Sequence, residues 1–111
     1  MNKPRLVKDY DKIDESVIQQ IKLRYPKGFE QNLVQFQNKE GKTVSALPFE
    51  MDDVYYLIRM TVLEAQEIID DDDDYDDDGF LKDDIREEYE EKFEEEFKEH
   101  REDEDEDQKA L

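Results

Sequence analysis

The 111-residue chain contains no cysteine and has only three glycines and one histidine. The lack of cysteine excludes disulfides, thiolate zinc sites, iron–sulfur clusters and a cysteine nucleophile. The glycines lie far apart in the sequence, so no glycine-rich loop can cradle a phosphate. His100, the single histidine, has no nameable partner for catalysis or metal binding. We therefore expect a protein that is not an enzyme and has no resident cofactor.

Long apolar runs are also absent. The longest is Val54–Ile58, far short of the roughly 20 residues that a membrane-spanning helix needs. Met1–Arg5 is not followed by an apolar stretch of signal-peptide length. We expect a cytoplasmic protein that does not bind membranes.

Charge is divided unevenly along the chain, whose net charge is −19. Met1–Ile69 holds 11 acidic and 10 basic residues, a net charge of −1. Asp70–Leu111 holds 24 acidic and 6 basic residues, a net charge of −18. The sequence thus predicts a compact, nearly neutral domain over residues 1–69 and an acidic arm beyond it.

The first predicted element is a helix over residues 14–25, which we expect the Asp14 side chain to cap. Four apolar residues recur there at helical spacing: Val17, Ile18, Ile21 and Tyr25. Two strands follow, over residues 33–38 and 43–49, joined by the turn Asn38-Lys39-Glu40-Gly41-Lys42. Residues 54–60 are rich in β-branched and aromatic side chains and favour a third strand, with a helix as the main alternative.

A second helix is predicted from Val62 to about Ile69, because Thr61 and Glu64 match a capping box. The order of elements indicates an α+β fold, a three-stranded antiparallel meander covered on one face by two helices. The predicted core is Val17, Ile18, Ile21, Tyr25, Val34, Phe36, Val44, Leu47, Tyr56, Ile58, Leu63 and Ile68.

An aspartate-rich loop is predicted over residues 70–80. Residues 70–78 contain eight aspartates interrupted only by Tyr75. Aspartate disfavours helix, and we expect such a run not to pack. The segment is therefore interpreted as a solvated loop or hinge.

Part of this loop matches the opening of an EF-hand calcium loop, which takes carboxylates at its first, third and fifth positions and glycine at its sixth. Those positions are Asp74, Asp76, Asp78 and Gly79, but the twelfth position, glutamate in that family, is Ile85 here. Two alternatives stay open. The three aspartates form a specific calcium site, or the loop gathers calcium and magnesium weakly and without selectivity.

A charged amphipathic helix is predicted over residues 81–101, followed by a disordered acidic tail over residues 102–111. Five apolar residues in the helix lie four apart: Leu81, Ile85, Tyr89, Phe93 and Phe97. Four residues turn the helix by about 400°, so this ridge winds by about 40° at each step. The helix is marginal alone, and we expect its ridge to dock on its own domain or on another chain.

The arm predicts binding to a positively charged partner. An extended chain over residues 70–78 would carry one charge per roughly 3.7 Å, close to the phosphate spacing of one DNA strand. Such a polyanion does not bind nucleic acid directly, but it can compete for a basic, nucleic-acid-binding surface. Carboxylates would steer the partner, and apolar side chains would anchor it. The candidate partner-binding residues are Ile85, Tyr89, Phe93, Phe97, Asp70, Asp71, Asp72, Asp73 and Asp74.

The chain resembles a known family in its acid-rich stretches, which lie over residues 70–78 and 102–107. A folded head followed by an acidic tail resembles the delta subunit of bacterial RNA polymerase in organisation, and the chain is similar to short acidic bacterial proteins. The resemblance implies a partner in transcription or other nucleic-acid machinery. The leading hypothesis is a non-catalytic acidic adaptor or regulator that binds a basic surface of a larger assembly. The alternatives are a divalent-cation module and an arm that only keeps the protein soluble.

Overall fold

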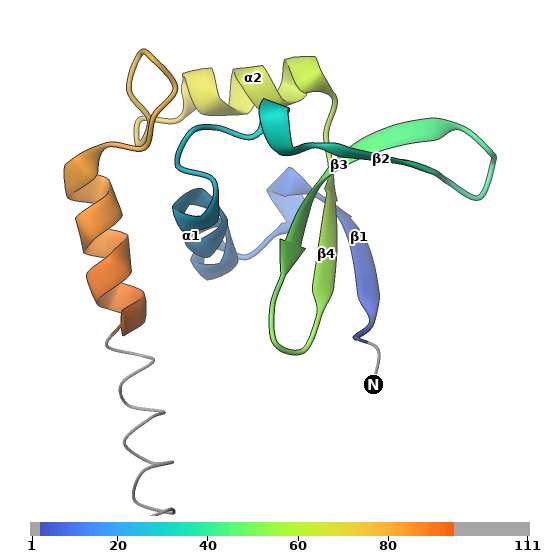
Figure 1. Ribbon diagram of the computed structural model, residues 1–111, viewed down its shortest axis with the longest axis horizontal. Coiled ribbons are helices and arrows are strands. Elements are labelled where there is room, and N and C mark those ends of the chain that lie inside the picture. The colour runs from blue at the N-terminus through green and yellow to red at the C-terminus, as the bar shows by residue number, and fades with distance from the viewer. Residues whose placement is uncertain (1–2, 95–111) are drawn as a thin grey trace, which may run out of the picture.

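A four-stranded mixed sheet organises residues 3–94, the part of the chain that the computed structural model describes (Figure 1). The sheet has the strand order β1-β4-β3-β2, in which β1 and β4 are parallel and the other neighbours antiparallel. The strands are β1 (Arg5–Asp9), β2 (Val34–Gln37), β3 (Thr43–Glu50) and β4 (Tyr55–Arg59). The helices are α1 (Glu15–Arg24), α2 (Val62–Asp71), the short 3-10 turns η1 (Tyr10–Lys12) and η2 (Glu30–Asn32), and an unlabelled helix over residues 83–94.

The predicted α+β class is confirmed, but the predicted three-stranded meander is wrong because the sheet contains a fourth strand. β2, β3 and β4 lie close to the predicted bounds, and β1 adds to β4 with a register from Arg5 opposite Tyr55 to Asp9 opposite Arg59. All five residues of β1 are exposed and three are charged. The segment therefore lacks the alternation of buried and exposed side chains that is typical of a strand. Its pairing is also non-local, which sequence periodicity does not reveal.

Local signals for a turn and a helix start are confirmed. The Asn38 backbone N donates to Lys42 O at 2.9 Å and closes the β2–β3 hairpin. At α2 the Glu64 N donates to Thr61 Oγ1 at 3.0 Å, and the Thr61 N donates to Glu64 Oε1 at 2.9 Å, which completes the capping box. The predicted side-chain cap of α1 is wrong, since the Asp14 carboxylate makes no capping hydrogen bond.

The main core lies between α1, α2 and one face of the sheet (Figure 1). Of the predicted core, Ile21, Leu47 and Ile58 are fully buried, whereas Val34 is 40% exposed and Leu63 is 63% exposed. Strand geometry explains the error at Val34, because alternate residues of a strand face opposite sides. The buried cluster is Ile13, Val17, Ile21, Phe29, Leu47, Phe49, Ile58, Met60, Ala65, Ile69, Tyr75 and Leu81.

A second apolar face lies on the side of the sheet away from α1 and α2. Val34 is opposite Ala46, and Phe36 is opposite Val44, so these side chains share a face that does not contain Leu47. Val44 and Leu47 are three residues apart on β3 and therefore cannot both enter the main core. The prediction that Val34, Phe36 and Val44 belong to that core is wrong for this reason.

The acidic half of the chain continues from the end of α2 through two turns into the helix over residues 83–94, which runs beside α1 (Figure 1). Phe97, His100, the end of the predicted helix at Arg101 and the predicted tail over residues 102–111 lie outside the described residues. Within residues 3–94 no helix combines the length and apolar character needed to cross a membrane.

Candidate functional site

The aspartate run begins inside α2 and then turns. The helix ends at Asp71, so Asp70 and Asp71 are helical and the predicted loop is shorter at its start. The carboxylate of Asp72 then accepts from the backbone N of Asp74 at 2.9 Å. Aspartate competes for backbone donors in this way when a helix ends, which is why the run changes from helix to turn here.

A second aspartate turn spans residues 76–80. Asp76 Oδ1 accepts from the backbone N of Asp78 and of Phe80, both at 2.9 Å. Gly79 adopts a φ of +85°, a conformation that a residue without Cβ enters at little cost. The Asp76 side chain is thus used to shape the backbone of its own turn.

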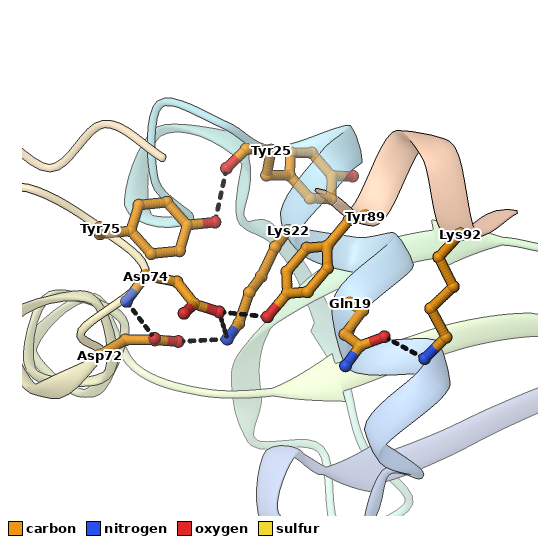
Figure 2. A network of polar contacts seen from close by, with 8 residues as sticks. All are labelled: Gln19, Lys22, Tyr25, Asp72, Asp74, Tyr75, Tyr89 and Lys92. Carbon is orange, nitrogen blue, oxygen red and sulfur yellow. Dashed lines mark hydrogen bonds and ion pairs between the residues drawn. The ribbon is translucent and has the colours of Figure 1, made fainter. Parts of the chain in front are cut away.

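Lys22 of α1 receives the two inward-facing carboxylates of the run (Figure 2). Its Nζ lies 2.7 Å from Asp72 Oδ2 and 2.8 Å from Asp74 Oδ2. The Lys22 side chain is only 7% exposed, and the two aspartate side chains are 18% and 20% exposed. The Tyr89 hydroxyl donates to the same Asp74 oxygen at 2.5 Å. A buried ammonium is costly unless it is paired, so this network fixes the acidic segment on α1.

Tyr75 and Leu81 anchor the same segment in the core. Tyr75 is 4% exposed, its ring meets that of Phe29 edge-on at 6.1 Å, and its hydroxyl donates to Tyr25 O at 3.0 Å. Leu81 is 5% exposed, and its backbone N donates to Pro26 O at 2.7 Å. The expectation that the run does not pack is wrong at Tyr75. The Tyr75 ring buries a large apolar area in the core, and the carboxylates on either side of it do not have to enter the core with it.

The pKa values in this network follow from burial and pairing. Burial by itself lowers the pKa of Lys22, but hydrogen bonds and attraction to the two aspartates outweigh it and raise that pKa above its usual range. Burial raises the pKa of Asp74, yet hydrogen bonds from Lys22 and Tyr89 bring it below its ordinary value. Burial and the bond to Asp74 both raise the pKa of Tyr89. At neutral pH Lys22 is therefore an ammonium, Asp74 a carboxylate and Tyr89 a neutral phenol.

The helix over residues 83–94 docks on its own chain through part of the predicted apolar ridge. Tyr89 is buried, Ile85 packs against the main core, and Phe93 is half-buried. Lys92 Nζ donates to Gln19 Oε1 of α1 at 2.7 Å (Figure 2). The helix was expected to dock either on its own domain or on another chain. Its described part docks on its own domain, through Ile85 and Tyr89.

Exposed carboxylates cover the outer side of this folded segment. Within residues 3–94, the only ion pair made by one of them is the contact of Glu90 Oε2 with Arg86 Nε, at 3.7 Å. Of the candidate partner-binding aspartates, the structure leaves three exposed and turns Asp72 and Asp74 inward. The exposed acidic residues between residues 70 and 94 are Asp70, Asp71, Asp73, Asp76, Asp77, Asp78, Asp83, Asp84, Glu87, Glu88, Glu90, Glu91 and Glu94.

The three aspartates of the calcium-loop match are used in different ways. Asp74 pairs with Lys22, and Asp76 accepts from two backbone amides, as described above. Asp78 is exposed. In the part of the chain that the structure describes, no group of three or more acidic or histidine side chains is arranged to hold a metal ion.

Sequence reasoning missed the burial of Lys22 and of Tyr75. A signal for the burial of Lys22 was present, because it lies four residues after Ile18 and directly after Ile21, on the apolar face of α1. A lysine at such a position requires a carboxylate partner. The signal for the burial of Tyr75 was that it is the single aromatic residue within the aspartate run.

Comparison of the chain with protein-family models, curated proteins and solved structures finds no match. The fold defines an α+β protein with a mixed four-stranded sheet, and its acidic segment defines the candidate site.

Proposed function

We propose that this protein is a non-catalytic adaptor or regulator that binds a basic surface of a larger assembly through its acidic segment. One observation carries this proposal. Thirteen exposed acidic residues lie between residues 70 and 94 on a folded support, and twelve of them make no ion pair with another described residue. Carboxylates on a folded backbone lose less backbone entropy on binding than those of a flexible chain. Their combined field attracts a basic partner from a distance.

The partner proposed is a basic protein surface. Imitation of one DNA strand requires an extended chain, but residues 70–80 form the end of a helix and two turns. The support for a partner in nucleic-acid machinery is therefore the resemblance in organisation and the charge itself. Direct binding to nucleic acid is opposed by that same charge.

Lys22 itself is not suited to act as a base or nucleophile. A lysine that acts as a base or nucleophile needs a lowered pKa, whereas pairing raises the pKa of Lys22. Divalent-cation binding has less support, because Asp74 is already neutralised by Lys22.

The test compares two full-length variants that each lose three negative charges. The arm variant carries Asp83→Asn, Glu87→Gln and Glu91→Gln on the exposed side of the last described helix. The control variant carries Glu40→Gln, Asp52→Asn and Asp53→Asn, which are exposed residues of the β2–β3 and β3–β4 loops. Each protein is used as bait in native lysate at several salt concentrations. We expect the arm variant alone to lose partners, and the wild-type contacts to weaken as salt rises.

Equal recovery by the two variants would contradict the proposal. So would wild-type binding that does not depend on salt. Deletion from Asp70 onward is not a suitable test, because it removes Tyr75 and Leu81 from the core.

A further inference from the structure

A groove of about 500 Å³ opens where the loop after α1, the helix α2 and the second aspartate turn meet. Three of its lining residues are buried and apolar: Phe29, Ala65 and Ile69. A space of this size lies within the usual range for sites that accept a small ligand, and it is large enough to admit a long side chain.

Two glycines, Gly28 and Gly79, are neighbours in the lining of the groove. A Cβ added at Gly28 would lie 3.7 Å from the backbone O of Gly79, and both glycines have positive φ. Gly28 belongs to the loop after α1, and Gly79 belongs to the second aspartate turn. The acidic turn is therefore one wall of the groove.

The rim of the groove is negatively charged. Glu30, Asp70, Asp77 and Asp78 line it together with a single lysine, Lys27, so the lining has a net charge of −3. Among residues 3–94 no ion pair is formed by any of these four carboxylates. Glu30 is held in place, since its carboxylate accepts from Gln66 Nε2 at 2.6 Å. The rim lacks the positive charge that would balance it.

Phe80 adds an aromatic ring to the same rim. It is 47% exposed, whereas Tyr75, Leu81 and Tyr89 of the same segment are buried. A guanidinium stacks on an aromatic face and also binds carboxylates with two parallel hydrogen bonds. An ammonium is a more strongly hydrated point charge and matches this combination less well.

We propose that this groove holds an arginine side chain of the basic partner protein. The inference rests on the proposed function and names the anchor by which the partner is recognised. The occupant is indicated by charge complementarity, because an arginine brings a positive charge to an unbalanced acidic rim and a flat face to Phe80. The apolar part of the lining accepts the methylene stem of the same side chain.

The direct test is a titration of the full-length protein with a peptide of alternating arginine and glycine, followed by amide NMR. The three glycines of the protein serve as reporters. Gly28 and Gly79 line the groove, whereas Gly41 lies in the β2–β3 hairpin. We expect the amide signals of Gly28 and Gly79 to shift saturably and that of Gly41 to stay in place. A matched lysine peptide should bind several-fold more weakly, and a citrulline peptide should not bind.

Two pairs of variants separate the ring from the charges. Phe80→Ala should weaken binding of the arginine peptide about threefold to fivefold and abolish the preference for arginine over lysine. Leu63→Ala, which also removes an exposed apolar side chain, should leave binding unchanged. Asp77→Asn with Asp78→Asn should weaken binding more than Asp52→Asn with Asp53→Asn, although both pairs remove two charges.

The outcomes distinguish this inference from the proposed function. Salt-dependent binding that shifts only the amides of residues 83–94, or equal affinity for arginine and lysine peptides, overturns the groove and leaves the acidic segment as a binding surface. If the basic peptides shift no amide at low salt, both proposals fail.

Discussion

The ammonium of Lys22 in α1 lies 2.8 Å from a carboxylate oxygen of Asp74, which follows it by 52 residues in the chain. This contact joins a helix of the nearly neutral half of the protein to a run of aspartates that the sequence assigns to solvent. A second carboxylate, from Asp72, completes the pairing at 2.7 Å. The acidic segment is consequently part of the fold.

Lys22→Met should destabilise the protein by about 2–4 kcal/mol, because it leaves Asp72 and Asp74 partly buried without a cation. The free energy of unfolding in urea measures this loss. The matched control is Lys42→Met, whose partner Glu40 lies 3.9 Å away in an exposed pair. That variant should lose less than about 1 kcal/mol. Equal and small effects of the two substitutions would contradict the role assigned to Lys22.

The contribution of Asp74 to stability should depend on pH. Burial raises the pKa of Asp74, but bonds from Lys22 and Tyr89 lower it below its ordinary value. The stabilisation is thus complete above the unfolded-state pKa of about 3.9 and is lost as pH falls through the lower folded-state value. Urea unfolding of wild type and Asp74→Asn should differ by a constant amount between about pH 5 and 8, and the difference should shrink below about pH 4. A difference that stays the same in acid would be inconsistent with this pairing.

Tyr75→Ala should cost roughly 3–5 kcal/mol, because it removes a large buried ring from the core. Phe80→Ala removes a ring from the same acidic segment, but Phe80 is 47% exposed and the loss should be below about 1 kcal/mol. Thermal or urea unfolding of both variants measures the difference. If the two substitutions have the same small effect, the aspartate run is a solvated loop, as the composition predicts.

Alkaline pH should unfold the protein through its buried tyrosines. Burial raises the pKa of Tyr10 to about 12, and it raises the pKa values of Tyr75 and Tyr89 as well. A group with a raised folded-state pKa stabilises the fold fully below its unfolded value, about 10, and loses that contribution as pH rises. Absorbance near pH 11 should report fewer than six phenolates in the native protein, whereas the chain in urea should ionise all six. Simultaneous ionisation of all six in the native state would exclude the buried arrangement.

The elements that sequence reasoning predicted correctly depend on neighbours in the chain. The β2–β3 hairpin follows from the turn at Asn38–Lys42, and the start of α2 follows from the reciprocal bonds of Thr61 and Glu64. Both signals span only a few residues, so local chemistry suffices to find them.

The parts that were missed depend on distant partners. β1 has no buried residue, and only its parallel pairing with β4 defines it as a strand. Val34 has the apolar character of a core residue, but its place opposite Ala46 puts it on the outer face. The sequence shows that the segment is acidic, but it does not show that the side chains of Asp72 and Asp74 point toward α1. Their direction depends on the position of Lys22, with which both carboxylates pair.

The most direct test of the account is the unfolding of residues 1–69 expressed alone, compared with that of the full chain. Tyr75 and Leu81 belong to the main core, and Lys22 is buried only together with its two aspartates. We predict that the shorter chain has no cooperative unfolding transition and a poorly dispersed amide spectrum. A shorter chain that unfolds cooperatively, with a free energy close to that of the full protein, would contradict the claim that the acidic segment is part of the fold.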